Sequence, residues 1–306
     1  MITFKKLGKL GNLGNQLHQI ASLIGFVEKY NCELVLPEWR YGQYFPNLPK
    51  QAQIVETEVA IEEPHYHYTP EFWDTYAETF RTKNVDISGW LQSEKYWQHC
   101  REKVFRALSV KEEIVKNVKE KFTEALKKNT IAISIRRGDF VTNPNHYLLP
   151  IHFYLNALLK YFPGYKTSNI IIFSDDVQYC KMEIKALPNI YFAAGLIAIE
   201  QLCLMSLCND FIISNSTFSW WGAMLGEKDG TTVIRSPHYL EGPLKDQLNI
   251  KDYYPERWIS YDHVGDKMDL RTVRNSYLSL AISKSKSRYK RGSKELFNKL
   301  KRIRKN

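Results

Sequence analysis

Arginine and aspartate residues at the end of one apolar stretch could hold a phosphate group. Arg136, Arg137, Gly138 and Asp139 directly follow the sequence Ile131-Ala-Ile-Ser-Ile135. A guanidinium group donates two parallel hydrogen bonds to a phosphate, so two neighbouring arginines suit a diphosphate ligand. Asp139 could accept a proton from a hydroxyl group or orient Arg137. The alternative interpretation is a surface ion pair at the end of a strand.

The apolar stretch itself predicts the strand that positions these side chains. Ile131, Ile133 and Ile135 are β-branched and alternate with small residues, a pattern typical of a buried strand. Gly138 would let the backbone turn sharply after the strand. Ligands of open α/β sheets bind outside the carboxyl ends of the strands, so we expect Arg136 at the mouth of such a crevice.

A second predicted strand also ends in charged residues. The apolar sequence Asn169-Ile-Ile-Ile-Phe173 runs directly into Ser174, Asp175 and Asp176. An ionised Asp175 can accept two hydrogen bonds from a guanine base, whereas Asp176 could instead cap the following helix. The two adjacent carboxylates point to opposite sides of an extended backbone, and the chain has no Asp-x-Asp sequence, so we expect no metal ion here.

A third predicted strand ends in hydroxyl groups. After Phe211-Ile-Ile213 come Ser216 and Thr217, at the predicted start of a helix where hydroxyl and backbone N–H groups favour phosphate. The two tryptophans that follow are expected to pack this helix rather than to touch a ligand. Strand, polar loop and helix repeat three times between about residues 130 and 260, which predicts a doubly wound parallel sheet with its polar strand ends at one crevice.

The N-terminal region contains a glycine-rich loop. Gly8, Gly11 and Gly14 precede a predicted helix with apolar residues at helical spacing. Free backbone N–H groups at such a helix start bind anions. The sequence is not GxGxxG and lacks the Lys-Ser/Thr pair of a P-loop, so a tight turn that needs glycine is the alternative.

The net charge of +10 is confined to the C-terminal tail. Residues 284–306 contain eleven Lys or Arg and one Glu, which equals the excess of basic over acidic residues in the whole chain. The balanced remainder argues against a nucleic-acid groove across the body of the protein. Leu296, Leu300 and Ile303 have helical spacing, so the tail is predicted to lie on an anionic membrane surface; a solvated terminus is the alternative.

Neither secretion nor membrane insertion is signalled by the sequence. No apolar run approaches the ~18 residues that a membrane-spanning helix needs, and the N-terminus lacks the apolar segment of a signal peptide. The five cysteines show no CxxC spacing, which indicates reduced thiols. We therefore expect a cytoplasmic protein, peripheral on the inner face of the membrane where the tail binds.

Five segments follow one another in an order that is specific to one protein family. They are Gly11-Asn-Leu-Gly-Asn-Gln-Leu-His-Gln-Ile-Ala21, Ser134-Ile-Arg-Arg-Gly-Asp139, Phe173-Ser-Asp-Asp176, Ile213-Ser-Asn-Ser-Thr-Phe-Ser-Trp-Trp-Gly222 and Tyr254-Pro-Glu-Arg-Trp258. Together they resemble the serial motifs of glycosyltransferase family 11, the α1,2-fucosyltransferases. The likeness covers about residues 7–260.

This resemblance implies an α/β fold of the GT-B type, with two Rossmann-like domains facing a central cleft. We expect an N-terminal acceptor-side domain over residues 1–128, a GDP-sugar-binding domain over residues 129–267, and a basic, partly helical tail over residues 268–306. The implied activity is inverting transfer of L-fucose from GDP-fucose to the 2-hydroxyl group of a terminal galactose in a glycan, with no metal and no cofactor. The alternatives are a transferase for another GDP-sugar and a carbohydrate-binding protein without catalysis.

The resemblance also implies roles for individual residues. Arg136, the first arginine of the HxRRxD motif, would hold the β-phosphate of the leaving GDP. Asn15 would lie near the phosphate and the sugar, and Asp175 would contact guanine. Asp139 is our candidate for the general base. The expected nucleotide-sugar-binding residues are Gly14, Asn15, Arg136, Asp175, Ser216, Thr217 and Phe218, and the expected catalytic residues are Arg136 and Asp139.

Two positions depart from the family pattern. Ser134 replaces the histidine of HxRRxD, so positioning of the phosphate by an imidazole is lost or supplied by another group. His18 stands where an aromatic residue is usual, and we expect it to be a packing residue.

Overall fold

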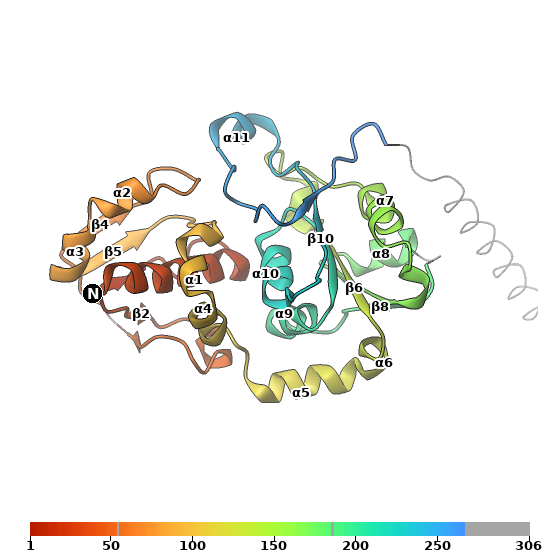
Figure 1. The fold of residues 1–306 in the computed structure, drawn as a ribbon, viewed down its shortest axis with the longest axis horizontal. Coiled ribbons are helices and arrows are strands. Elements are labelled where there is room, and N and C mark those ends of the chain that lie inside the picture. The colour runs from red at the N-terminus through yellow and green to blue at the C-terminus, as the bar shows by residue number, and fades with distance from the viewer. Residues whose placement is uncertain (54, 185–186, 267–306) are drawn as a thin grey trace, which may run out of the picture.

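The chain forms two halves that lie side by side, each built around parallel strands (Figure 1). A computed structural model describes residues 1–53, 55–184 and 187–266. The basic tail, residues 268–306, for which a helix and membrane binding are predicted, lies outside the described residues. Within the described part of the chain, no helix is both long and apolar enough to cross a membrane.

The N-terminal half is a small parallel sheet around one long helix. Its elements are β1 (Ile2–Thr3), α1 (Leu13–Tyr30), β2 (Leu36–Pro37), β3 (Gln51–Ala52), β4 (Val59–Glu62), α2 (Pro70–Asp74), α3 (Ala77–Thr82), β5 (Val85–Ser88) and α4 (Arg101–Ala107). Three strands have the order β1-β5-β4, and β2 pairs with β3. An isolated bridge between Ile2 and Leu34 brings the segment just before β2 beside β1, so the two small sheets are neighbours.

The C-terminal half is a sheet of six parallel strands. Its elements, with the helices that lead to it, are α5 (Glu112–Lys121), α6 (Thr123–Leu126), β6 (Thr130–Ile135), α7 (Ile151–Tyr161), β7 (Asn169–Ser174), α8 (Val177–Glu183), β8 (Ile190–Phe192), α9 (Ala198–Ser206), β9 (Asp210–Ile213), α10 (Thr217–Gly226), β10 (Val233–Arg235), α11 (Gly242–Gln247) and β11 (Ile259–Ser260). The spatial order is β11-β10-β9-β6-β7-β8. Counted from β6 this is the 3-2-1-4-5-6 order of dinucleotide-binding folds, which confirms the predicted doubly wound sheet.

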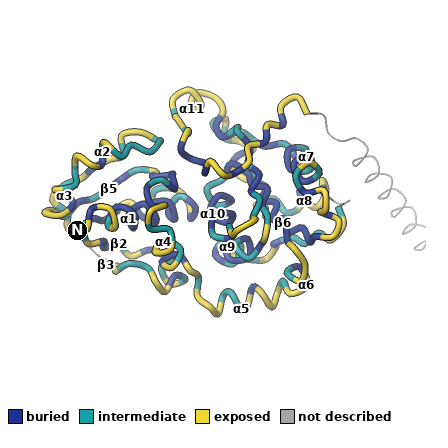
Figure 2. The backbone as a smooth tube through the Cα atoms, viewed as in Figure 1, coloured by how far each residue is buried: buried dark blue, intermediate teal, exposed yellow. Residues whose placement is uncertain are grey.

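The alternating residues of β6 divide the interior into two cores. Ile131, Ile133 and Ile135 belong to a buried cluster with side chains of α7 and α8. Ala132 belongs to a second cluster, which contains α9, α10 and the apolar side of α1. Burial is accordingly concentrated along α1, α10 and β6 (Figure 2). Because the second cluster runs from one half of the chain into the other, the two halves share a core.

Two stretches of the sequence predict longer elements than the structure contains. Apolar residues at helical spacing predict one helix over residues 110–128, but it is interrupted at Phe122, between α5 and α6. The apolar sequence over residues 32–37 predicts a strand, of which β2 keeps two residues. Aromatic residues from Trp39 onward could stack on a sugar or pack on their own loops; Trp39 and Phe45 are only 5% and 1% exposed, so these two rings fill the core.

His18 lies at the junction of the two halves. It is fully buried, with its ring centroid 4.4 Å from that of Trp220 and 5.2 Å from that of Trp221, which are also fully buried. Desolvation lowers the pKa of His18 to about 3, so the imidazole stays neutral. His18 and both tryptophans are therefore packing residues, as the sequence predicted.

Ion pairs reinforce this junction, and they explain the last of the five sequence motifs. Arg257 donates two hydrogen bonds to Glu94 of the N-terminal half, at 2.6 and 2.8 Å, and its Nε donates to Glu227 at 2.8 Å. Arg101, also from the N-terminal half, donates to Glu227 at 2.7 Å. Trp258 donates its indole N–H to the same carboxylate at 2.9 Å. Arg257 thus connects the two halves through two nearly buried carboxylates.

We expect Arg257→Ala to lower the free energy of unfolding by about 3 kcal/mol, the lower end of the range for removing one partner of a buried ion pair. The lower end applies because the Arg257 side chain is itself 41% exposed. Burial alone would raise the pKa of Glu227, but hydrogen bonds from Arg257, Arg101 and Trp258 outweigh it and hold that pKa below the usual 4.5. The interactions of ionised Glu227 therefore stabilise the folded protein fully at a pH above the unfolded-state pKa of this residue. That stabilisation is lost as the pH falls through the lower pKa of Glu227 in the folded state.

Urea unfolding near neutral pH and again in mild acid measures both effects. Arg257→Ala should lose stability and also show a weaker acid dependence than the unaltered protein. Lys127→Ala is the matched control, since it breaks a pair with Glu124 in which both side chains are exposed, and we expect a change below about 1 kcal/mol. Equal losses in the two variants would show that the junction does not depend on Arg257.

Candidate active site

A cavity of about 320 Å³ lies between the two halves of the chain. It opens at the carboxyl ends of β6 and β9, on either side of the point where the strand order reverses, which is the usual ligand position in doubly wound sheets. The cavity brings together seven of the residues predicted from the sequence. They are Gly14, Asn15, Arg136, Asp139, Ser216, Thr217 and Phe218.

Arg136 is held in this cavity by two carboxylates. Its Nη2 donates to Oδ1 of Asp139 at 2.5 Å, and its Nη1 pairs with Oδ2 of Asp175 at 2.9 Å. The Nε atom is buried and has no hydrogen-bond partner among the described residues. Since the side chain is still 30% exposed, a fixed guanidinium group faces the cavity.

Arg137 is directed elsewhere. Its Nε lies 3.3 Å from Oδ2 of Asp176, and its guanidinium group stacks 3.5 Å from the ring centre of Tyr179. The other oxygen of Asp176 accepts a hydrogen bond from the backbone N–H of Tyr179 at 2.9 Å, so Asp176 is the cap of α8. The idea that Asp139 orients Arg137 is wrong, because Asp139 pairs with Arg136.

Gly138 lies where the chain turns after β6, and it has a second role. It begins a short 3-10 helix (Gly138–Val141), and a Cβ atom at this position would lie 2.4 Å from Oδ2 of Asp175. The absence of a side chain therefore lets the Asp175 carboxylate reach the arginine loop. The Oδ1 atom of Asp175 also accepts a hydrogen bond from the backbone N–H of Arg137 at 2.9 Å. Both oxygens of Asp175 serve this loop, and a contact with guanine stays a prediction.

A second cavity, of about 200 Å³, adjoins the first at Arg136. Arg136, Ser216 and Phe218 line both cavities, whereas Phe173 and Asp175 line only the second one. One guanidinium group therefore serves both cavities, which suits a ligand that extends from one to the other and carries negative charge where they meet.

Two helices begin at the first cavity, one from each half. Ser216 caps α10, its hydroxyl oxygen accepting a hydrogen bond from the N–H of Phe218 at 3.3 Å. α1 begins at Leu13. The two helix starts touch at Gly14, where a Cβ atom would lie 2.5 Å from the backbone nitrogen of Phe218. Two positive helix ends thus face one cavity, which favours an anion.

Asn15 is oriented by a network of side chains from both halves. Its Oδ1 accepts a hydrogen bond from Gln92 at 2.8 Å, and Gln92 in turn accepts hydrogen bonds from the hydroxyl groups of Tyr66 and Tyr239. The two tyrosine hydroxyls lie 3.0 Å apart. Asn15 therefore presents a fixed side chain to the cavity.

Ser134, which stands in place of the motif histidine, lines the second cavity together with Ser219. Its hydroxyl group is 2.6 Å from that of Ser219, which is 2.8 Å from that of Ser214. All three residues are buried. Ser134 therefore has its own hydroxyl partners, and it brings no imidazole to the cavity wall.

The structure adds cavity residues that sequence reasoning missed. His146 stacks on Phe140 with ring centroids 4.2 Å apart, and desolvation lowers the pKa of this imidazole. Asn215 donates hydrogen bonds to the backbone carbonyls of Tyr147 and Tyr239, at 2.9 and 2.8 Å, which fixes both loops at the cavity rim. Asn215 lies within a recognised motif and could have been found there, but nothing in the sequence marks His146.

A third cavity, of about 390 Å³, belongs mainly to the N-terminal half. Its walls include His65, Tyr66 and Trp90, a tryptophan that is 37% exposed. The rings of His65 and His67 stack 5.3 Å apart. This cavity shares no lining residue with the two around Arg136.

Two Rossmann-like domains with the candidate site in the cleft between them define a fold of the GT-B class. The chain belongs to glycosyl transferase family 11, whose family model matches residues 3–261. The family predicted from the five motifs is therefore confirmed.

Two curated relatives come from Escherichia coli. The alpha-1,2-colitosyltransferase is 29% identical over 185 residues, which cover 58% of this chain and 62% of that protein. The O-antigen biosynthesis glycosyltransferase WbnK is 35% identical over 134 residues, which cover 41% of this chain and 44% of that protein. The matched regions thus span less than two thirds of either relative.

Solved structures support the fold. The crystal structure of POFUT1 in its apo form has a TM-score of 0.53 at 14% identity, covering 76% of this chain and 97% of that chain. POFUT1 in complex with GDP gives a TM-score of 0.52 at 13% identity with the same coverage.

Proposed function

We propose that this protein transfers L-fucose from GDP-fucose, with inversion and without a metal ion, to the 2-hydroxyl group of a terminal galactose. The observation that carries the proposal is Arg136, fixed by two carboxylates between two adjoining cavities and faced by the starts of α1 and α10. The diphosphate would lie at Arg136. The guanosine would extend into the cavity lined by Asp175, and the sugar into the cavity lined by Asn15.

Arg136 would supply the main electrostatic stabilisation. When the bond between the sugar and the phosphate breaks, negative charge develops on the leaving GDP, and a fixed cation stabilises that charge without reorganising. Ser216, Thr217 and Phe218 would add hydroxyl and backbone N–H donors at the start of α10. The guanidinium group would take the place that a metal ion has in other transferases.

Asp139 is the proposed general base for the acceptor hydroxyl. It lines the cavity, and its side chain is 55% exposed. Oδ1 is engaged with Arg136, whereas Oδ2 has no hydrogen-bond partner among the described residues. A base at this position would couple removal of the acceptor proton to the cation that stabilises the leaving group.

The names of the relatives bear on the donor and the linkage. The relative named alpha-1,2-colitosyltransferase supports a 1,2-linkage and makes another donor sugar the main alternative. POFUT1, a fold neighbour solved in complex with GDP, supports a GDP-linked donor in the proposal. A carbohydrate-binding protein without catalysis is the alternative from another class.

Calorimetry of the full chain with GDP, with and without EDTA, separates these functions. We expect GDP to bind in both conditions, and transfer to β-galactosides to be faster from GDP-fucose than from GDP-mannose. Analysis of the product linkage by NMR would test the 2-hydroxyl group. Sugar binding without any affinity for GDP would leave only the carbohydrate-binding alternative, and preference for a different GDP-sugar would assign another donor.

A further inference from the structure

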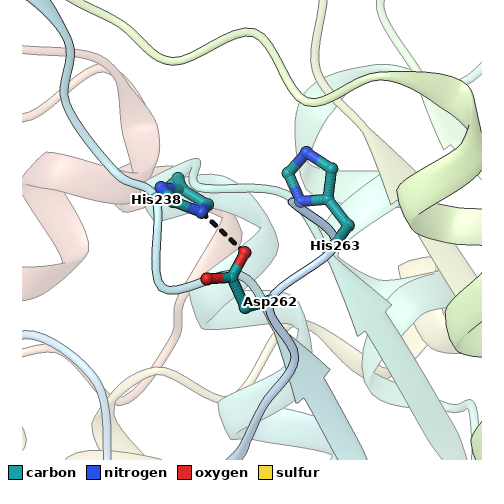
Figure 3. Close-up of side chains that lie close together, drawn as sticks. All are labelled: His238, Asp262 and His263. Atoms are coloured by element: carbon teal, nitrogen blue, oxygen red, sulfur yellow. Dashed lines mark hydrogen bonds and ion pairs between the residues drawn. The ribbon is translucent and has the colours of Figure 1, made fainter. Parts of the chain in front are cut away.

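Three potential metal ligands meet at the outer end of the C-terminal sheet (Figure 3). His238 follows β10, and Asp262 and His263 follow β11. Nε2 of His238 lies 2.8 Å from Oδ1 of Asp262, and one ligand atom from each residue lies within 4.8 Å of the others. Among the described residues this is the one such group of three, and the sequence contains no His or Cys after His263.

A simple ion pair does not account for His263. This side chain is only 3% exposed, and its Nδ1 is buried with no hydrogen-bond partner among the described residues. Its Nε2 lies 3.3 Å from the hydroxyl group of Tyr147. If Nε2 carries the hydrogen and donates to Tyr147, Nδ1 has a free lone pair, and Figure 3 shows a ring nitrogen of His263 facing the Asp262 carboxylate. Buried polar atoms normally have a partner, so this orphan nitrogen points to a ligand.

We propose that His238, Asp262 and His263 bind one divalent transition-metal ion, of which Zn²⁺ is the representative. Two imidazoles and a carboxylate are a common zinc set, whereas Mg²⁺ and Ca²⁺ prefer all-oxygen ligands. With bonds of about 2.0–2.1 Å, side-chain shifts of about 1 Å would bring the three atoms onto one ion. The ion replaces the hydrogen shared by His238 and Asp262, and that proton leaves to solvent or moves to Nδ1 of His238.

The ion would be structural, outside the cavity of Arg136. None of the three ligands lines that cavity, but two residues next to the site do. Tyr239 directly follows the ligand His238, and His146 directly precedes Tyr147, the partner of His263. A bound ion would therefore fasten the loop after β10 to the segment after β11 and hold two loops at the cavity rim. Tyr147 would act as the outer partner that orients His263, as is usual for metal-binding histidines. The inference does not depend on the proposed transferase activity.

The test uses the full chain, stripped with chelator and then titrated with ZnCl₂ by calorimetry. We expect one ion per chain, a higher thermal midpoint with Zn²⁺ than without it, and a visible absorption band when Co²⁺ is used instead. Tyr147→Phe should weaken binding by about 10–100-fold, the usual effect of losing an outer partner, and Asp262→Ala or His238→Ala should weaken it further. These three side chains are less buried than His263, so the test does not rely on a His263 variant that fails to fold.

His65→Ala/His67→Ala is the matched control, because it removes a stacked histidine pair that lacks a third ligand. This double variant should bind Zn²⁺ normally. The proposal is overturned if no Zn²⁺ binds to the unaltered chain, if binding survives in Asp262→Ala and His238→Ala, or if it disappears in the control. Asp262→Ala keeps every residue of the Arg136 cavities, so sugar transfer by this variant in EDTA tests metal-independent catalysis separately.

Discussion

Arg136→Ala is expected to lower the rate of sugar transfer by about 10²–10³-fold, the usual effect of removing one preplaced donor from the charge that develops in a transition state. The guanidinium group is fixed before the substrate binds, by Asp139 at 2.5 Å and Asp175 at 2.9 Å. Without it, those two carboxylates would face the diphosphate unpaired, so GDP affinity should also fall. Steady-state kinetics and GDP calorimetry measure the two effects.

Arg136→Lys separates charge from geometry. Lysine keeps the positive charge but cannot bridge two carboxylates with a planar fork and still offer a donor to the phosphate. We expect a rate between those of Arg136→Ala and the unaltered protein. Near-normal rates in both variants would exclude Arg136 from catalysis.

Arg137→Ala is the matched control for this experiment. The arginine is adjacent in sequence and has the same charge, yet it pairs with Asp176, stacks on Tyr179 and lines neither cavity. Its removal should lower stability more than turnover. A loss of turnover as large as that of Arg136→Ala would mean that the net charge of the loop matters, rather than one positioned cation.

The sequence predicts the arginine strand correctly because the signals for it are local. Ile131, Ile133 and Ile135 alternate with small residues, and in the structure the isoleucines and Ala132 pack into cores on opposite faces of the sheet. The change from apolar to charged residues marks the end of the strand. The carboxyl ends of parallel strands share one edge of a sheet, so Arg136 and Ser216 could be placed together before any coordinates.

Other features of the site depend on contacts between distant residues. Arg136 faces the cavity and Arg137 does not, because of the 3-10 turn at Gly138 and the approach of Asp175 to that turn. Asp175 is 39 positions after Arg136 and 37 after Gly138 in the sequence. His146 lines the cavity with its ring stacked on Phe140 and its backbone bridged to Leu240. Asp262 and His263 meet His238 because β11 pairs with β10. None of these pairings leaves a periodic or motif signal in the sequence.

Gly14→Ala is expected to lower turnover by about 100-fold, although it adds a single methyl group. A Cβ atom at this position would lie 2.5 Å from the backbone nitrogen of Phe218, 2.5 Å from the carbonyl carbon of Thr217 and 2.6 Å from its Oγ1. Two of these atoms belong to the backbone, so a side-chain rotation cannot relieve the contact. To reach ordinary van der Waals separation, α1 and α10 must move apart by about 1 Å, and an error of that size in a catalytic site can cost 10²-fold in rate.

The protein should still fold, because overpacking of this kind costs about 1–3 kcal/mol and the shared core on either side of the contact remains. Gly164→Ala is the control: it makes the same chemical change where no heavy atom lies within 4 Å of the added methyl group. Urea unfolding identifies conditions in which both variants are fully folded, and turnover is compared there. Normal turnover of folded Gly14→Ala would show that the two helix starts can separate without harm, and the anion site would then have to rest on Arg136 and the α10 hydroxyl groups alone.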